Sequence, residues 1–388
     1  MNGRGASDTG GGSEAAAAAS PPGDEILARV NPGLAGIRPY VPGLSVEEAR
    51  RRLGGGRFVK MASNENPLGI CPGAARALRR AVRRSFQYPE VAGDELRQAL
   101  AKRHGLAPEH LILGNGGDGI LYTLALTLLA EGDEVLIPRL TYSYYEITAR
   151  AFRARVVRAA ARDFRADLDD LAARVTDRTK IVFLCNPNNP TGALIPRAEL
   201  EAFLDRLPER VFAVCDEVYA DFADPKLLPG TFQRIRAGRR NLVVVRSFSK
   251  AYGLAGVRLG WGAACRELVE LMHRVRPPFE VSVPAQAAGL AALRDERFYR
   301  RTLALAAREK ERLGRGLAEL GLACIPSHTN FLLVDTGRDG REVADRLLRQ
   351  GFIVRAGLDP QLASFIRITL GTRRQNERLL GALAEVLR

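Results

Sequence analysis

A chain of 388 residues with 46% hydrophobic and 26% charged residues has the composition of a globular protein with a large core, usually of about two or three domains. Its net charge of +14 would suit nucleic acid, but the arginines are scattered along helical stretches without zinc-ligand spacing or an RNA-binding motif. We therefore expect a solvated basic surface and no nucleic-acid partner. No apolar run reaches the roughly 18 residues of a membrane helix, so no membrane partner is expected either.

The cysteines and residues 1–23 indicate the cellular compartment in which the protein is expected. The five cysteines are far apart and form no C-x-x-C pair, which fits a reducing environment, and the four histidines show no metal-ligand spacing. Residues 1–23 are rich in Gly, Ala and Ser and too weakly apolar for a signal peptide. We expect them to form a disordered tail on a cytoplasmic protein without a metal site.

Regular structure is expected from about residue 24. Helical spacing predicts helices over 72–84 and 93–104, followed by a brief strand over 111–113 and an apolar helix over 118–130. Short apolar segments then alternate with helical or loop segments, and they span 134–137, 155–157, 180–184, 211–215 and 242–245. Such strands predict an α/β fold with a mostly parallel sheet covered by helices on both faces.

The pattern changes after Pro277 and Pro278. A long helix over 298–320 leads into further strands and helices, which span 330–334, 340–350, 352–355, 365–369 and the C-terminal region. These elements predict a second, smaller α/β unit. We accordingly expect three folded parts: an N-terminal segment associated with the small domain (24–66), a large domain (67–290) and a small C-terminal domain (291–388).

Lys250 follows the strand predicted over 242–245 and is one of only six lysines in a chain whose positive charge otherwise comes from arginine. A lysine in this setting suggests a need for an amine, because a desolvated lysine can lose its proton and attack a carbonyl, whereas arginine cannot. Ser247, Ser249 and Arg258 are close enough in sequence to bind a phosphate dianion. The implied ligand carries an aldehyde and a phosphate, as pyridoxal 5′-phosphate does. Taken alone, the lysine could equally be an ordinary surface residue.

Two further predicted strands end in polar loops. Strand 180–184 runs into a loop that contains Asn189, and strand 211–215 runs into Asp216 and Tyr219. Ligands of open parallel sheets bind beyond the carboxyl ends of the strands, so these side chains could meet Lys250 at one site. An ionised Asp216 would keep a pyridine nitrogen protonated, while Asn189 and Tyr219 could donate hydrogen bonds to the ring's phenolate oxygen. Without the other groups, Asp216 would be interpreted as a helix N-cap.

Residues 114–119 match the pattern G-x-G-x-x-G between a predicted strand and a predicted helix. A dinucleotide site would also need an acidic residue at the end of the next strand, and the nearest ones precede that strand. Backbone N–H groups at a helix N-terminus bind any phosphate, so the phosphate of pyridoxal phosphate serves equally well. Tyr142, which follows the strand over 134–137, would stack on the pyridine ring or pack in the core.

With these residues in place, the chain resembles the fold-type I pyridoxal-phosphate-dependent aminotransferases, and among them the histidinol-phosphate aminotransferase family. The resemblance runs from about residue 29 to the C-terminus. It is carried by motifs at 62–69, 87–90, 114–118, 186–192, 216–219, 247–261, 276–279 and 367–373.

The resemblance implies a role for each motif. Lys250 would bond covalently to the cofactor aldehyde, with Asp216, Tyr219 and Asn189 around the pyridine ring and Tyr142 stacked on it. Further residues would hold the cofactor phosphate, and they are Gly117, Asp118, Ser247, Ser249, Arg258 and, from the neighbouring subunit of a homodimer, Tyr88. The substrate pocket would be formed by Arg367, Arg355 and Asn66.

The chain departs from the family pattern at several positions. Glu280 and Ser282 stand where asparagines are frequent, and Gly119 stands where an acidic residue is common. Arg374 and Gln375 replace two common glutamates. None of these residues belongs to the expected cofactor set, so they bear on the substrate rather than on the cofactor.

The resemblance implies a homodimeric transaminase that converts histidinol phosphate and 2-oxoglutarate into imidazole-acetol phosphate and glutamate. An aromatic amino-acid aminotransferase is the nearest alternative, and a threonine-phosphate decarboxylase is a more distant one. A nicotinamide-dependent oxidoreductase using residues 114–119, or a regulator that binds pyridoxal phosphate without turnover, are alternatives from other classes.

Overall fold

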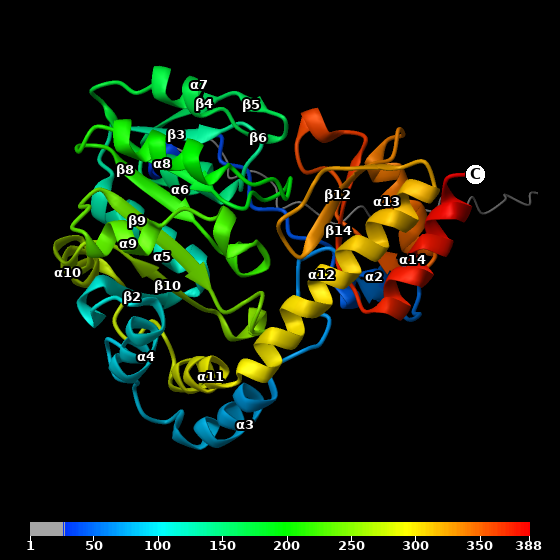
Figure 1. Ribbon diagram of the computed structural model, residues 1–388, viewed down its shortest axis with the longest axis horizontal. Helices are drawn as coiled ribbons and strands as arrows, with labels where there is room; N and C mark the ends of the chain where they lie inside the picture. Colours follow the sequence, from blue (N-terminus) through cyan, green and yellow to red (C-terminus); the bar gives the residue numbers. More distant parts are fainter. Residues whose placement is uncertain (1–25, 27) are drawn as a thin grey trace, which may run out of the picture.

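The computed structural model describes residue 26 and residues 28–388, so the tail predicted over residues 1–23 lies outside the described residues. Two parts are visible in Figure 1: a larger one built around a broad sheet, and a smaller one that contains the C-terminus. The long helix α12 (Glu296–Glu319) runs from the larger part along the smaller one. No helix in the described part of the chain is long and apolar enough to cross a membrane.

The larger part contains a seven-stranded sheet in the order β2-β10-β9-β8-β7-β3-β4. Its strands are β2 (Leu111–Asn115), β3 (Glu134–Pro138), β4 (Arg155–Ala159), β7 (Thr179–Cys185), β8 (Phe212–Asp216), β9 (Leu242–Ser247) and β10 (Leu259–Ala263). Strands β9, β8, β7, β3 and β4 pair in parallel, whereas β10 is antiparallel to both of its neighbours. The predicted α/β fold with a mostly parallel sheet is confirmed.

Both faces of this sheet are buried, because successive side chains of a strand point to opposite faces. In β9, for example, Leu242 and Val244 pack in one apolar core while Val243 and Val245 pack in the other. The first core is covered by α3 (Pro72–Ala81), α4 (Asp94–His104), α7 (Leu168–Ala173), α8 (Arg197–Arg206), α9 (Thr231–Arg236) and α11 (Val283–Arg294). The second is covered by α5 (Gly116–Leu128), α6 (Tyr144–Ala151) and α10 (Arg266–Val275).

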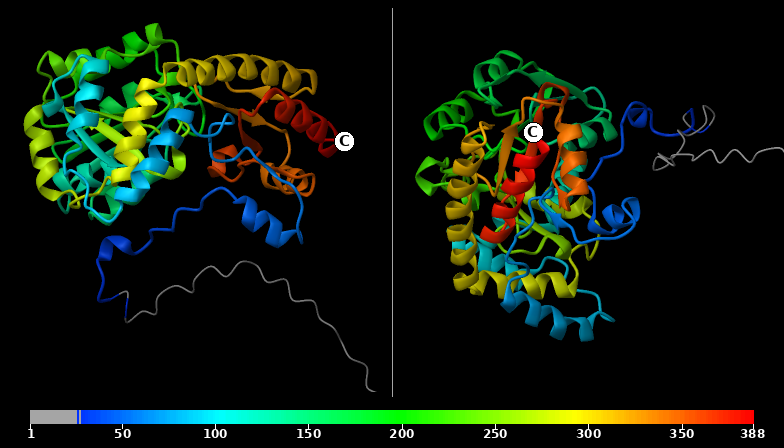
Figure 2. Two further views of the ribbon diagram at one scale, coloured as in Figure 1. Left: turned by 90° about the horizontal axis from the view of Figure 1, so that it is seen from below. Right: turned by 90° about the vertical axis from the view of Figure 1, so that its right-hand side faces the viewer.

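The smaller part packs its helices against a three-stranded antiparallel sheet in the order β11-β12-β14. Its elements are β11 (Ala323–Cys324), β12 (Phe331–Asp335), α13 (Gly340–Arg349), β13 (Phe352–Ile353), β14 (Phe365–Thr369) and α14 (Arg373–Val386). The N-terminal segment adds α2 (Val46–Arg52) and β1 (Val59–Lys60), and β1 pairs in parallel with β13. Figure 2 shows this segment running beneath both parts. The domain limits at residues 66 and 290 stay a prediction.

One strand of the large sheet was not predicted. Strand β10 begins at Leu259, within the glycine-rich motif 247–261, and no strand was predicted after 242–245 in this part of the chain. Glycine is needed here for close approach, because a Cβ on Gly260 would collide with the backbone of Gly116 and Gly117. The turn that begins α5 therefore packs directly on β10. A two-stranded hairpin, β5 (Ala161–Arg162) and β6 (Arg165–Ala166), was also not predicted.

Candidate active site

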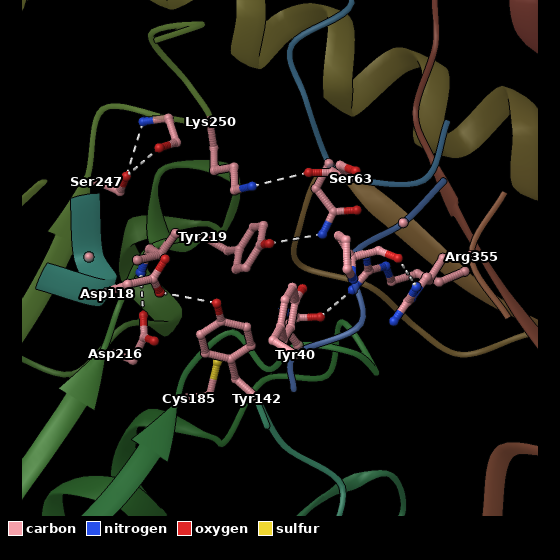
Figure 3. Close-up of a pocket in the computed structure, with 18 of the residues that line it drawn as sticks. Tyr40, Ser63, Asp118, Tyr142, Cys185, Asp216, Tyr219, Ser247, Lys250 and Arg355 are labelled. Carbon is pink, nitrogen blue, oxygen red and sulfur yellow. Dashed lines mark hydrogen bonds between the residues drawn. The ribbon is translucent and has the colours of Figure 1, made fainter. Parts of the chain in front are cut away.

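A cavity of about 250 Å³ lies where the carboxyl ends of β7, β8 and β9 face the N-terminal segment and the smaller part. Strand ends contribute one wall, as expected for an open parallel sheet. Residues from three distant stretches of chain contribute the opposite wall: the N-terminal segment, β14 and the residues after β13. Figure 3 shows Lys250, Tyr219 and Asp118 on the first side and Arg355 on the other.

Lys250 extends from the turn after β9 into this cavity. Its Nζ donates a hydrogen bond to the main-chain oxygen of Ser63 at 3.2 Å and lies 5.7 Å from the centre of the Tyr219 ring. Burial and the nearby positive charge of Arg367 lower the pKa of Lys250 to about 8. A neutral, nucleophilic amine is therefore accessible near physiological pH, which an ordinary lysine would not provide.

Asp216 ends β8 and is buried at the bottom of the same cavity. Burial raises the pKa of Asp216 to about 6, even though two donors favour its ionised form. These are the hydroxyl of Tyr145, which donates to Oδ2 at 2.6 Å, and the main-chain N–H of Val218, which donates to Oδ1 at 3.1 Å. A ligand cation placed beside this carboxylate would keep it ionised.

The turn that begins α5 and the turn after β9 form an anion-binding end of the cavity. Asp118 there accepts a hydrogen bond from Arg258 at 3.4 Å. The buried hydroxyls of Ser247 and Ser249 are hydrogen-bonded to each other at 2.9 Å. The guanidinium of Arg258 lies against Gly116, where a Cβ would collide with it. A phosphate group could be bound here by the N-terminus of α5, the two serine hydroxyls and the guanidinium of Arg258.

Three further predicted residues line the middle of the cavity. Tyr142 donates a hydrogen bond from its hydroxyl to Asp118 at 3.0 Å, and burial raises the pKa of Tyr142. The hydroxyl of Tyr219 accepts a hydrogen bond from Nδ2 of Asn64 at 2.8 Å. The side-chain oxygen of Asn189 accepts a hydrogen bond from Arg367. These three side chains and Lys250 all face one space.

Arg367 and Arg355 lie opposite each other in an antiparallel bridge. Their main chains exchange hydrogen bonds, with 2.7 Å from the N–H of Arg367 and 3.1 Å from that of Arg355. The Arg367 guanidinium is buried and donates to the main-chain oxygen of Ala62 at 2.8 Å. Its Nε has no hydrogen-bond partner among the described residues. Burial lowers the pKa of Arg367, and the charge of Arg355 adds to that effect.

Two predicted site residues lie outside the cavity in this conformation. Asn66 is behind Lys250, where its amide donates to the main-chain oxygen of Ala251 at 3.2 Å and to the hydroxyl of Thr302 at 3.1 Å. Its amide is thus used to hold the chain rather than to face a substrate. Tyr88 is 80% exposed and stacks on Phe279 with ring centres 4.5 Å apart.

Several residues that line the cavity or support its lining were not predicted from sequence. Asn64 contacts the Tyr219 hydroxyl, Ser63 accepts from Lys250, Tyr145 supports Asp216, and Tyr40 packs edge-on against Tyr142 at 6.4 Å. Asn64 also has a left-handed φ of 56°, which is uncommon outside glycine. The polar run at 62–69 was the one available signal for Ser63 and Asn64.

The cavity fits pyridoxal 5′-phosphate on the chemistry of its own residues. Lys250 offers an amine of lowered pKa, and buried Asp216 offers a carboxylate that needs a cationic neighbour. The phosphate-binding end lies beside both of them. No group of three or more His, Cys, Asp or Glu in the described residues is arranged to hold a metal ion.

Comparison with known proteins gives the same class. Residues 57–383 match the family described as aminotransferase class I and II, so the chain belongs to this family. It is a pyridoxal-phosphate-dependent aminotransferase, and the resemblance inferred from the motifs is confirmed.

Within this family, the chain is similar to several proteins named histidinol-phosphate aminotransferase. The chain is 44% identical to the histidinol-phosphate aminotransferase of Moorella thermoacetica, with 90% of this chain and 91% of that protein covered. It is 43% identical to the protein of the same name from Anaeromyxobacter, with 92% and 99% covered. Among solved structures it is similar to the Sinorhizobium meliloti histidinol-phosphate aminotransferase in complex with pyridoxal-5′-phosphate. That structure superposes with a TM-score of 0.86 at 32% identity, covering 93% of this chain and 98% of the other.

Proposed function

We propose that the protein transfers an amino group from histidinol phosphate to 2-oxoglutarate, which yields imidazole-acetol phosphate and glutamate in histidine biosynthesis. The names of its relatives support this assignment. The pair formed by Arg367 and Arg355 is the observation in the cavity that supports it most strongly.

Two arginines directly opposite each other across a bridge repel, and a buried cation without an anion is costly. Among the described residues, neither Arg367 nor Arg355 forms a salt bridge. Both donate instead to neutral groups: Arg367 to Ala62 and Asn189, and Arg355 to the main-chain oxygens of Val41 and Pro42. A phosphate dianion between them would supply the missing charge through forked, charge-assisted hydrogen bonds.

The remaining cavity residues would hold the cofactor. Its phosphate would be bound by the N–H groups of Gly117 and Asp118, the hydroxyls of Ser247 and Ser249, and the guanidinium of Arg258. When bound, pyridoxal phosphate supplies an aldehyde for the amine and a conjugated ring that withdraws electrons from the substrate's Cα. Asp216 would keep the ring nitrogen protonated, and Tyr219 with Asn189 would donate to the ring oxygen.

Lys250 has two roles in this proposal. Its amine would hold the cofactor aldehyde until the substrate amine replaces it. The released Nζ, which has a lowered pKa, would remove the proton from the substrate's Cα and pass it to the cofactor carbon. Water would then break the bond between the substrate carbon and nitrogen, which would release imidazole-acetol phosphate and leave the amino group on the cofactor. With 2-oxoglutarate the same steps would run in reverse and yield glutamate.

We also propose that the enzyme is cytoplasmic and homodimeric, and Tyr88 supports the dimer. It is exposed together with Val82, Phe86 and Val91, which form an apolar stretch that a partner subunit would cover. Tyr88 would reach the cofactor phosphate of that partner, so each site would need both chains.

Mixed dimers test this arrangement. Lys250→Ala and Tyr88→Ala chains, each inactive or weakened alone, should regain about a quarter of the wild-type activity when co-expressed. Only the mixed dimer pairs an intact lysine with an intact tyrosine. Activity no higher than that of the separate variants would contradict the shared site.

A substrate panel tests the assignment itself. Single-turnover reactions are followed by the loss of the visible band of the lysine-bound cofactor, with histidinol phosphate, phenylalanine and threonine phosphate as donors. We expect histidinol phosphate to react with a kcat/KM at least about a hundredfold higher than phenylalanine, which lacks the dianion. A preference for phenylalanine would assign an aromatic aminotransferase, and carbon dioxide release from threonine phosphate would assign a decarboxylase.

A further inference from the structure

Glu280 lies against the turn that joins β2 to α5, although it comes from the distant loop between α10 and α11. Its Oε1 accepts a hydrogen bond from the main-chain N–H of Asn115 at 2.9 Å. Glu280 is partly buried, and no salt bridge to it occurs among the residues that the structure describes. The carboxylate is therefore committed to the turn rather than to a surface cation.

Gly119 makes room for this carboxylate. A Cβ built on Gly119 would lie 2.6 Å from Oε1 of Glu280, closer than a real contact allows. The two departures from the family pattern noted at these positions are thus one feature in space. The chain lacks an acidic side chain at residue 119, and Glu280 places a carboxylate beside that position.

The hydrogen bond to Asn115 completes the start of α5. Asn115 is the N-cap of this helix, and its own side chain makes no capping hydrogen bond. In a capping box, the residue three positions after the N-cap accepts from the N-cap's N–H. That residue is Asp118, whose carboxylate instead accepts from Tyr142 and Arg258. Glu280 supplies the missing acceptor from another loop.

The turn is therefore held from two sides. On one side, β10 approaches it so closely that Gly260 could carry no side chain. On the other side is Glu280, whose loop is fixed by the buried Arg276. The guanidinium of Arg276 donates hydrogen bonds to the main-chain oxygens of Leu113, at 3.3 Å, and of Val91. The charge of Glu280 opposes the lowering of the Arg276 pKa by burial.

We propose that Glu280 is a positioning residue that fixes the N-terminal turn of α5, so that the N–H groups of Gly117 and Asp118 point at the cofactor phosphate. Gly119 is part of the same device, because only glycine leaves the carboxylate in place. This inference rests on the phosphate assignment made above for the cavity, and not on the identity of the substrate.

The test compares two ligands of the apoenzyme: pyridoxal phosphate and pyridoxal, which lacks the phosphate. Glu280→Ala should weaken pyridoxal phosphate about tenfold and pyridoxal less than about twofold, because the turn touches only the phosphate. Glu280→Gln keeps an acceptor oxygen, so its affinity for pyridoxal phosphate should stay within about threefold of wild type. Equal losses for both ligands, or no loss for either, would overturn the proposal.

Gly119→Ala provides a second, independent arm. In the wild-type background its methyl group should displace the Glu280 carboxylate and weaken pyridoxal phosphate by about as much as Glu280→Ala does. In the Glu280→Ala background the same methyl group meets no carboxylate and keeps only a 3.3 Å contact with the Cβ of Asn115, so the further change should be less than about twofold. Additive losses in the double variant would contradict the coupling between the two residues.

Arg258→Ala separates this inference from the assignment on which it rests. If the phosphate lies where proposed, Arg258→Ala weakens pyridoxal phosphate but not pyridoxal. Should that variant bind both ligands normally, the phosphate assignment itself is wrong. If Arg258→Ala shows the selective loss and Glu280→Ala does not, only the role of Glu280 is wrong.

Discussion

The two walls of the cavity are built in different ways. On the cofactor wall, polar groups stand at the ends of neighbouring strands, and most are already paired: Asp216 with Tyr145, and Asp118 with Tyr142 and Arg258. On the opposite wall, two arginines share one bridge and donate only to neutral groups. The hydrogen bonds of these two carboxylates on the cofactor wall are thus formed without a ligand, whereas the other wall carries two positive charges that have no anionic partner among the described residues.

This difference shows which part of the function is general and which is specific. Side chains that are already fixed by hydrogen bonds to one another can bind the same cofactor whichever substrate is present. A wall with unbalanced positive charge selects among incoming anions. Substitutions on the first wall should therefore change the chemistry for every substrate, and those on the second should change the preference among substrates.

Replacement of Lys250 should have the largest effect. Lys250→Ala removes both the covalent anchor and the proton carrier, so activity should fall by more than about 10⁴-fold with every donor. Lys310→Ala is a matched control, since burial lowers the pKa of Lys310 to about 8 as well, but its Nζ donates to Ser327 away from the cavity. Borohydride reduction followed by peptide mapping should label Lys250 and not Lys310. Labelling of any other lysine contradicts the assignment.

Asp216→Asn should come next, with activity lower by about 10²–10³-fold because the ring nitrogen loses its anionic partner. The same change should stabilise the apoenzyme. The folded-state pKa of this carboxyl is raised to about 6, so ionisation opposes folding above the unfolded value of 3.8. The increase in the free energy of unfolding of the variant over that of wild type should grow between about pH 4 and pH 6. Above pH 6 it should stay constant, at up to about 3 kcal/mol. Chemical denaturation of the apoenzyme from pH 4 to pH 8 measures it. A variant that is less stable at pH 8 would show that the carboxylate is not strained.

Arg367→Lys probes the other wall while keeping its charge. A lysine cannot make the forked contact, so the KM for histidinol phosphate should rise by about 10–100-fold. The dissociation constant of pyridoxal phosphate should not change. Arg355→Lys should have a smaller effect, because Arg355 also holds the main chain at Val41 and Pro42. Weaker cofactor binding in Arg367→Lys would mean that the two walls do not act separately.

Tyr145→Phe should have the smallest effect of the series. It removes one of the two donors to Asp216, which raises the pKa of that carboxyl further. We expect activity to fall by about five- to tenfold near neutral pH, with the acid limb of the pH–rate profile displaced to higher pH. Tyr144→Phe, at the neighbouring position, is the control. An unchanged acid limb would exclude Tyr145 from this role.

The cofactor wall could be predicted from sequence because its residues follow predicted strands at short intervals. Lys250, Asp216 and Asn189 each come within five residues of a strand end. The strand order then brings them together whatever lies between. Tyr142 was predicted in the same way, because it follows the end of β3, and it lines the cavity.

The other contacts depend on tertiary structure that no local pattern shows. Asn64 meets Tyr219 across 155 residues, and Glu280 meets Asn115 across 165. Tyr145 was missed because an aromatic residue on an apolar helix is more often core packing, and its hydroxyl reaches Asp216 only through the order of β3, β7 and β8. The antiparallel β10 was missed because its glycines, which allow close packing, are also typical of loops.

The contribution of the substrate's phosphate tests the central claim most directly. Histidinol phosphate and histidinol differ only in that group, and single-turnover reactions of the wild-type enzyme with each can be followed through the cofactor's visible band. If the arginine pair binds a dianion, kcat/KM should be at least about a hundredfold higher for histidinol phosphate, and Arg367→Lys should reduce that ratio. Equal kcat/KM values for the two donors would contradict it.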